Sequence, residues 1–287
     1  MTTPSTALTP GDAHHALPEM VLRPARGWMA VDWRELWEYR ELLGFLVLRD
    51  VKVRYKQTVL GVSWAVLQPV FTMVVFSVIF GGLAKLPSDG LPYPVFVYAG
   101  LLAWQFFSSS VTSASNSLLN QQALLTKIYL PRLYVPISTV LGSLVDLLIS
   151  FAVFAVIMAI YRVMPGWGLL ALPILVVVTT MAALGVGLVL AALVVTYRDI
   201  RHIVPFLLQA WLYVSPVIYP VTMIPEQWRW LLALNPIAGI IDGYRSALLQ
   251  KPWDVQTLAV STVASVAVFL FGVFYFRKTE RRFADIA

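Results

Sequence analysis

Six segments of the chain are apolar enough to lie inside a lipid bilayer. A helix needs about 20 consecutive apolar residues to cross the hydrocarbon core, where every backbone polar group must find its hydrogen bond within the protein. The expected spans are residues 59–82, 95–119, 138–161, 169–195, 205–219 and 256–276, of which the fifth is short and bounded by prolines. The pattern predicts an all-α membrane protein with six transmembrane helices.

The composition excludes a soluble globule. Hydrophobic residues make up 59% of the 287 residues and charged residues 13%, whereas a soluble domain has roughly a quarter charged residues. The chain contains no cysteine, which excludes disulfides and thiolate metal sites. Residues 1–29 lack the apolar stretch of a signal peptide, and we expect them to form a flexible tail.

Residues 30–58 are expected to form an amphipathic helix at the membrane interface, followed by a basic junction. Trp33, Trp37 and Leu43 fall on one side of this helix, whereas acidic residues lie opposite. Tryptophans on an otherwise charged helix favour the headgroup layer; an ordinary helix packed on a partner is the alternative. The junction carries the basic residues Arg49, Lys52, Arg54 and Lys56.

The lysines and arginines predict the orientation. If both termini are cytoplasmic, including the tail 277–287, sixteen of the 21 lysines and arginines lie in inner segments. The outer segments then hold Lys85, Arg162, Arg229, Arg245 and Lys251. Positive charge near the ends of spans marks the cytoplasmic side. The net charge of +6 is attributed to topology and anionic lipid, and no nucleic-acid partner is expected.

Residues 220–252 are too apolar for a solvated loop and too interrupted to span the membrane. Non-helical backbone at membrane depth is tolerated where protein or a water-filled cavity satisfies it, so we expect a pair of short re-entrant helices. The breaks and small residues are Pro220, Pro225, Asn235, Pro236, Gly239 and Gly243. The last two have the spacing of close helix packing, which suits a re-entrant helix; a dimer face is the alternative.

Polar residues form a stripe along the second expected span. Gln105, Ser109, Thr112 and Asn116 fall in a narrow sector of a 3.6-residue helix. They either cement helix packing in lipid or line a hydrated translocation path, which suits a sugar polymer because sugars need hydrogen-bonding groups and aromatic faces. The fifth span contributes two further candidates for this path, Gln209 and Tyr213.

Asp146 is a carboxylate well inside the third expected span. An intramembrane acid is a functional candidate by default. There are two interpretations. In the first, Asp146 pairs with another helix or lies in the polar path; in the second, it takes part in a proton relay. Since the same span contains no His, Lys or second acid, we expect the former and assign Asp146 to the path.

Motifs for ATP binding or catalysis are absent from the sequence. There is no Gly-Lys dipeptide, hence no phosphate-binding P-loop. His14, His15 and His202 do not form a metal-ligand pattern. We therefore expect a non-catalytic chain without a cofactor or metal of its own, and any ATP-driven transport would require a separate ATPase.

The stretch RDVKVRYKQTVLGVSWAVLQP (residues 49–69) resembles the opening signature of the ABC-2-type permeases that export O-antigen, capsule and teichoic-acid polymers. Further landmarks follow in the same order: KIYLPR (127–132), YRD (197–199), SPVIYP (215–220), and NP (235–236) through GYR (243–245). Each motif is weak alone, whereas the ordered set is specific. The resemblance extends from Arg49 to about Gln250.

The resemblance implies a homodimer of six-helix subunits, each docked on a cytoplasmic ATP-binding subunit that holds ATP and Mg. The segment between spans two and three would be the coupling helix, with Lys127, Ile128, Tyr129, Leu130, Pro131 and Arg132 facing the ATPase. The re-entrant pair would form an outer gate. The basic junction would meet the pyrophosphate of the lipid anchor, unless its long side chains simply snorkel to the interface.

The sequence therefore leads to a permease subunit in a bacterial inner membrane that moves undecaprenyl-pyrophosphate-linked polysaccharide such as O-antigen. Teichoic acid, capsule or a small-molecule drug are alternative substrates, because the same architecture serves them all. A proton-coupled secondary transporter using Asp146 is a further alternative, against which the absence of an evident internal repeat counts. A membrane-embedded enzyme would need a cluster of acids, histidines or arginines that the sequence does not offer.

Overall fold

The computed structural model describes residues 37–280 except 38, 57–62 and 126–129. These residues belong to one compact unit, residues 34–287. Several sequence-based expectations lie outside them: the tail 1–29, the start of the predicted interface helix, and Lys127, Ile128 and Tyr129 of the predicted coupling helix. The regular elements of the described residues are all helices, in agreement with the predicted all-α class.

The helices follow the apolar runs closely. In chain order they are α2 (Arg40–Lys56), α3 (Ser63–Phe76), the π-helical turn η1 (Ser77–Leu83), α4 (Tyr93–Asn120), α5 (Gln122–Leu125), α6 (Tyr134–Ile160), the 3₁₀ turn η2 (Trp167–Ala171), α7 (Leu172–Thr196), α8 (Ile200–Val214), the 3₁₀ turn η3 (Val221–Met223), α9 (Glu226–Ala233), α10 (Ala238–Leu249) and α11 (Val255–Glu280).

Five segments of the described residues are long and apolar enough to cross a membrane: Ser63–Leu83, Tyr93–Asn120, Tyr134–Ile160, Trp167–Thr196 and Val255–Glu280. They correspond to the first, second, third, fourth and sixth expected spans. The structure thus confirms a multi-pass helical architecture and five of its spans by length and composition.

The fifth expected span, residues 205–219, is shifted in the structure. Helix α8 begins at Ile200 and ends at Val214, because Ser215 precedes a proline and takes an extended conformation, as residues before proline prefer. Pro205 lies inside α8 rather than at its boundary. With 15 residues, α8 is about 22 Å long, shorter than the roughly 30 Å hydrocarbon core.

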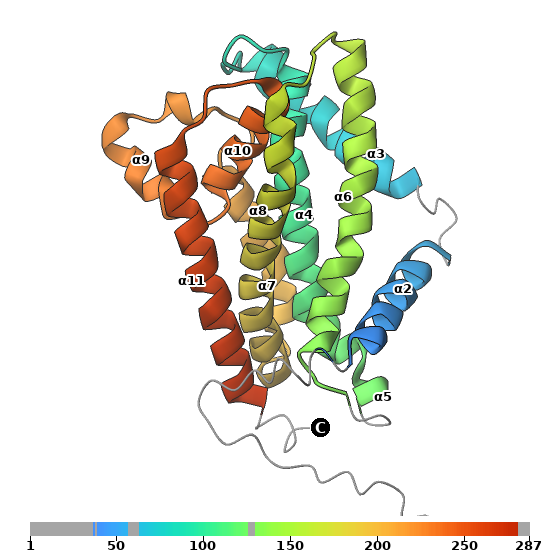
Figure 1. Cartoon of the computed structure of the whole chain (residues 1–287). Helices are drawn as coiled ribbons and strands as arrows, with labels where there is room; N and C mark the ends of the chain where they lie inside the picture. Colours follow the sequence, from blue (N-terminus) through green and yellow to red (C-terminus); the bar gives the residue numbers. More distant parts are fainter. Residues whose placement is uncertain (1–36, 38, 57–62, 126–129, 281–287) are drawn as a thin grey trace, which may run out of the picture. The chain divides into compact units, whose positions relative to one another are not determined.

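Helix α4 lies at the centre of the bundle and packs against α6, α7 and α10 (Figure 1). It is the most buried of the five spans, and α3 is the least buried. In Figure 1, α9, α10 and the turn before α4 lie toward the upper end, whereas α5 and the end of α11 lie at the lower end. The polar stripe of α4 is therefore carried on the helix around which the others assemble.

Helices α7 and α11 cross at backbone contact through two glycines. A Cβ atom on Gly185 would lie 2.6 Å from the amide nitrogen of Phe269, and a Cβ atom on Gly272 would meet the backbone of Gly185. Small residues permit such close approach of helices in lipid. This crossing fixes α11 against the side of α7.

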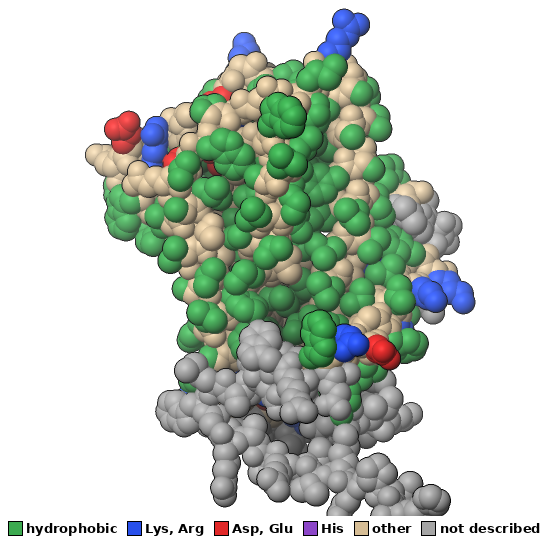
Figure 2. All heavy atoms as spheres, in the orientation of Figure 1, with side chains coloured by type: hydrophobic (Ala, Val, Ile, Leu, Met, Phe, Trp, Pro, Cys, Tyr) green, Lys and Arg blue, Asp and Glu red, His purple; other side chains and the backbone are tan. Residues whose placement is uncertain are grey.

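The exterior is apolar where lipid would surround it. Large exposed side chains on α6, α7 and α11, such as Leu148, Ile174, Val263 and Leu270, expose at least 62% of their area, as does Phe71 on α3. Figure 2 shows hydrophobic side chains covering the middle of the molecule, with charged ones toward its ends. A soluble protein does not expose such a continuous patch, so this surface fits a bilayer.

Helix α2 extends further than predicted, because the basic junction continues it as a helix to Lys56. Its described part is not simply two-sided: Leu46 is buried, whereas Phe45 and Leu48 are exposed. The physical reason is that α2 packs one side on α6 and leaves apolar residues on the other. Apolar residues therefore lie on more than one side of α2, and much of the predicted amphipathic stretch lies before the described residues.

Candidate functional site: a polar cavity on α4

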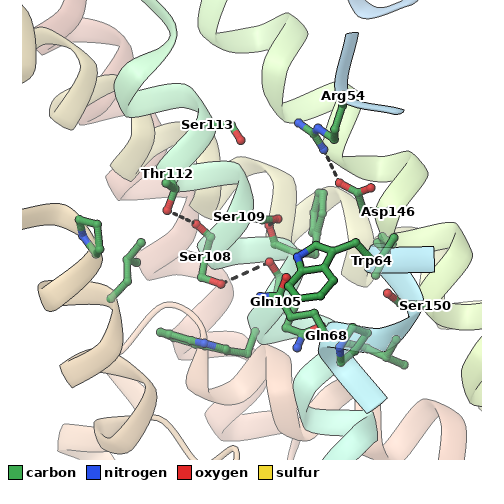
Figure 3. A pocket seen from close by; sticks show the side chains of 18 of the residues that line it. Arg54, Trp64, Gln68, Gln105, Ser108, Ser109, Thr112, Ser113, Asp146 and Ser150 are labelled. Atoms are coloured by element: carbon green, nitrogen blue, oxygen red, sulfur yellow. Dashed lines mark hydrogen bonds and ion pairs between the residues drawn. The ribbon is translucent and has the colours of Figure 1, made fainter. Parts of the chain in front are cut away.

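A cavity of about 920 Å³ opens along α4, bordered by residues of α2, α3, α6 and α8. Its polar lining consists of Arg54, Tyr55, Gln68, Gln105, Ser108, Ser109, Thr112, Ser113, Asp146, Ser150 and Gln209. Its remaining lining includes Trp64, Trp104, Phe106, Leu147 and Leu208. The close view in Figure 3 shows the labelled serines and threonine of α4 on one wall, with Trp64 and Gln68 nearby.

The cavity brings together most of the predicted translocation path. Gln105, Ser109 and Thr112 of α4 line it together with Asp146 and Gln209. These five residues come from α4, α6 and α8, so the fold brings together side chains that are up to about a hundred residues apart in the chain. The stripe on α4 faces open space along this part rather than a packed helix.

Asn116 and Tyr213 are absent from the cavity lining. The Asn116 amide donates hydrogen bonds to the Thr112 carbonyl (2.9 Å) and to Ser115 Oγ (3.3 Å). Tyr213 is half exposed, and its hydroxyl accepts a 3.5 Å hydrogen bond from the Gln209 amide. In a single copy of the chain the cavity therefore ends before these two positions.

The hydroxyls of α4 bond to their own helix. Ser108 donates to the Gln105 carbonyl (3.3 Å), Ser109 to the Phe106 carbonyl (3.3 Å) and Thr112 to the Ser108 carbonyl (2.8 Å). This local bonding is usual for hydroxyl side chains in helices. Each oxygen keeps acceptor capacity toward the cavity, so the wall offers acceptors without fixed charge.

Asp146 is paired with another helix and also lies in the cavity. Its carboxylate accepts hydrogen bonds from the Arg54 guanidinium and the Tyr55 hydroxyl, both near the end of α2, as the dashed line to Arg54 in Figure 3 shows. Burial raises the pKa of Tyr55 well above its ordinary value, and the hydrogen bond to Asp146 acts in the same direction. The Tyr55 hydroxyl is therefore a proton donor to the carboxylate at any physiological pH.

The four basic residues of the junction have different surroundings. Arg49 forms an ion pair with Asp50 at 2.8 Å, and Arg54 pairs with Asp146. Lys52 and Lys56 are exposed. Two of the four residues predicted to meet a pyrophosphate thus already have a carboxylate partner.

Asp50 connects α2 with both ends of the predicted coupling region. Its Oδ2 accepts a hydrogen bond of 3.0 Å from Ser138 Oγ of α6 and one of 3.5 Å from the Gln121 amide after α4. Leu130 is buried in an apolar cluster with Leu46 of α2. Pro131 is partly buried, and Arg132 donates to the Glu280 carbonyl at 3.0 Å. The described end of the coupling region is therefore held by α2 and α11.

The predicted gate segment contains two short helices, α9 and α10. Pro220 and Pro225 precede η3 and α9, respectively. Asn235, followed by Pro236, accepts a hydrogen bond from Trp211 Nε1 and donates one to Ser215 Oγ, each 3.0 Å long. These bonds join the turn between α9 and α10 to the end of α8.

Helix α10 is buried along its whole length. The Gly239 amide donates to Ser261 Oγ at 3.0 Å, and a Cβ atom on Gly239 would lie 2.5 Å from the Thr257 carbonyl of α11. Gly243 faces Leu175 and Leu258. The two glycines thus serve packing inside the chain.

Arg245 on α10 is a site that the sequence did not single out. Its side chain is fully buried, and its two terminal nitrogens donate 2.6 Å hydrogen bonds to the Pro216 and Val217 carbonyls. In the sequence it appeared only as one of the outer cations and as the last residue of the GYR landmark. Further cavity residues were also missed: Tyr55, Trp64, Gln68, Trp104, Ser108, Ser113 and Ser150. Ser108 and Ser113 directly neighbour stripe residues in the sequence, so the helical periodicity could have identified them most easily.

Spanning helices that surround a polar, aromatic-bordered cavity define a multi-pass membrane protein of the transporter type. Residues 41–249 match the family described as ABC-2 type transporter, and the chain belongs to this family. The match covers α2 through α10, and therefore every helix that borders the cavity.

The chain is similar over most of its length to polysaccharide-export proteins. It is 31% identical to the O-antigen export system permease protein RfbA of Myxococcus xanthus, over 88% of this chain and 97% of that protein. A protein of the same name from Klebsiella pneumoniae is 27% identical, over 86% and 95%. The polysialic acid transport protein KpsM of Escherichia coli is 28% identical, over 71% and 80%.

Proposed function

We propose that the chain is the membrane-spanning subunit of an ATP-driven exporter that moves lipid-linked polysaccharide, such as O-antigen, across a bacterial inner membrane. The observation that carries the proposal is a cavity lined by hydroxyls, amides and tryptophans, in a chain that aligns with nearly the whole length of an O-antigen permease. Such a lining offers sugars hydrogen bonds and aromatic faces with little fixed charge.

A separate ATPase would drive the transport. The sequence has no Gly-Lys dipeptide, so ATP and Mg would bind to a partner subunit. We assign the docking surface to residues 120–136, including Lys127, Ile128 and Tyr129. The support is that the described neighbours, Leu130 and Arg132, are anchored to α2 and α11, which would transmit movement of this segment to the bundle.

The working unit would be a homodimer. Helices α3 and α8 flank the cavity and carry exposed apolar residues, among them Trp64 and Phe71 on α3 and Phe206 and Leu207 on α8. A second copy placed against these faces would cover them and close the polar cavity on its open side. Homo-oligomers commonly use such a twofold arrangement.

Helix α8 would be the remaining transmembrane helix, lengthened by the turn that follows it, and α9 with α10 would form the re-entrant outer gate. The support is the complete burial of α10 among α4, α7 and α11. Both termini would be cytoplasmic, in line with the sixteen inner lysines and arginines. The exposed Lys52 and Lys56 would then attract the anionic lipid anchor.

Deletion of the gene in its native host tests the proposal. We expect surface polysaccharide to disappear and lipid-linked polymer to accumulate inside the cell, with both effects reversed by the wild-type chain. Unchanged surface polysaccharide would contradict the proposal. Loss of resistance to a drug, without loss of polymer, would instead identify a small-molecule exporter of the same family.

A further inference from the structure

The cavity on α4 combines polar and apolar side chains, and its described lining residues carry no net charge. Among its described lining residues, the charged side chains are Arg54 and Asp146, and these two form an ion pair with each other. They expose 31% and 28% of their side-chain area, so the pair borders the cavity rather than lying in the core. Figure 3 shows the Arg54 guanidinium directed at the Asp146 carboxylate, beyond the hydroxyls of α4.

We infer that Asp146 determines substrate specificity: by neutralising Arg54 it restricts the path to glycans whose repeat units are uncharged. This inference rests on the proposed export function and specifies the chemical class of the polymer. The carboxylate is held in place from α2, where Tyr55 donates a second hydrogen bond to it. Arg54 is thereby kept from binding an acidic sugar.

Among the described lining residues, an acidic repeat unit would meet no cation that is free of a carboxylate partner. Removing a carboxylate from water is costly unless a partner is supplied, and the cost grows where the surroundings are apolar, because Coulomb interactions strengthen as the dielectric constant falls. An uncharged hexose has no such cost. Its hydroxyls find acceptors on Ser109 and Thr112 and amide groups on Gln68 and Gln105.

A twofold copy would add the same lining, so dimerisation would not alter this balance. Each copy would contribute one Arg54 and one Asp146, and the enclosed path would again be neutral. The exposed cations Lys52 and Lys56 lie outside the lining. They suit the single pyrophosphate of a lipid anchor, whereas the neutral cavity suits the sugar chain behind it.

The test uses the complete transporter, this chain with its ATPase, in inverted proteoliposomes. The two substrates are undecaprenyl-pyrophosphate-linked oligosaccharides of equal length, one with a hexose in each repeat and one with the corresponding uronic acid. ATP-dependent accumulation of each in the lumen is measured. We expect the wild type to transport the hexose polymer at least about tenfold faster, which corresponds to a modest difference in barrier.

Asp146→Asn should narrow this ratio to within about threefold, because it frees the Arg54 cation while keeping the shape of the side chain. Arg54→Gln should widen the ratio, and the double variant R54Q/D146N should return it to the wild-type value because the charge again cancels. Lys85→Gln, which removes an exposed cation that does not line the cavity, is the control and should preserve the ratio.

Equal transport of both polymers by the wild type would overturn the inference while supporting polysaccharide export. An unchanged ratio in Asp146→Asn would overturn it as well. If Asp146→Asn does not fold, the ratio in Arg54→Gln decides: a wider ratio supports the inference and an unchanged one overturns it. Transport of neither polymer by the wild type would overturn the proposed function and this inference together.

Discussion

The guanidinium of Arg245 lies over the ring of Phe96, with its central carbon 3.7 Å from the ring centroid. This contact joins α10 to the first turn of α4. The same guanidinium donates to the Pro216 and Val217 carbonyls after α8. A fully buried arginine is normally satisfied by carboxylates or several acceptors, and here backbone carbonyls from two segments are the hydrogen-bond acceptors. Arg245 thus ties the proposed gate to α4 and to the end of α8.

Replacement of Arg245 by methionine should strongly destabilise the chain. It leaves the Pro216 and Val217 carbonyls without their donors, at a cost of about 1–3 kcal/mol for each buried group, and it removes the contact over Phe96. The melting temperature of the detergent-solubilised protein should fall clearly. Lys85→Met, which removes an exposed cation, is the control and should melt like the wild type. Equal melting of both variants would show that Arg245 does not hold these segments together.

Two neighbouring serines allow a cavity position to be compared with a packed position. Ser109 lines the cavity, whereas Ser110 is fully buried. Ser109→Leu should therefore block polymer export with little loss of stability, because the added methyls enter open space. Ser110→Leu should lower stability by about 1–3 kcal/mol, since it overpacks a filled position. Surface polymer and melting temperature measured on both variants distinguish the two effects; normal export by a folded Ser109→Leu protein would remove Ser109 from the path.

Cysteine labelling tests the orientation of the chain, which has no cysteine of its own. Lys85→Cys is suitable for the outer side because Lys85 is exposed, whereas the nearby Ser88 is half-buried and hydrogen-bonded to the Leu91 carbonyl. An impermeant thiol reagent added to intact cells should label residue 85 and not Thr126→Cys. Labelling of residue 126 and not of residue 85 would show that the chain has the opposite orientation in the membrane.

The proposed coupling region predicts a separation of ATP hydrolysis from export. Lys127→Glu should reduce polymer export and weaken the response of the ATPase to the permease, because the charge offered to the partner is reversed. The protein should still insert and melt normally. Arg162→Glu, on the predicted outer side, is the matched charge reversal and should leave coupling intact. Full coupling in Lys127→Glu would refute the assignment.

The contact between Asp89 and Lys251 predicts sensitivity to acid. Burial alone would raise the pKa of Asp89, but the 2.5 Å hydrogen bond and charge of Lys251 and the hydrogen bond from Thr222 outweigh it and lower the pKa. A lowered pKa contributes stability above the unfolded value of about 4 that is lost as the pH falls through the folded pKa. Wild type should therefore melt above Asp89→Asn at pH 7, and the difference should vanish in acid. If the difference in melting temperature persists in acid, it arises from packing and not from the charge of Asp89.

Hydropathy and helical periodicity predicted much of the fold, because burial in lipid leaves a strong signal in sequence. The stripe of Gln105, Ser109 and Thr112 was found since one helix carries all three. A partner for Asp146 on another helix was considered, but Arg54 was not identified as that partner, because the two residues are 92 positions apart and meet only in the tertiary structure. Arg245 escaped notice for a related reason: its acceptors are carbonyls, which every residue has. The end of α8 was misplaced because Ser215, not the later Pro220, terminates the helix.

The hydroxyls of Ser108, Ser109 and Thr112 already donate to carbonyls of α4. A passing sugar can donate to their oxygens without first breaking a hydrogen bond of the helix. These oxygens therefore offer a sugar a series of similar hydrogen-bond acceptors along α4, rather than one specific binding site. A polymer could exchange one acceptor for the next as it moves. In the proposed exporter, ATP hydrolysis by the partner subunit would then limit the rate of export, and the polymer would not pause between rounds of hydrolysis.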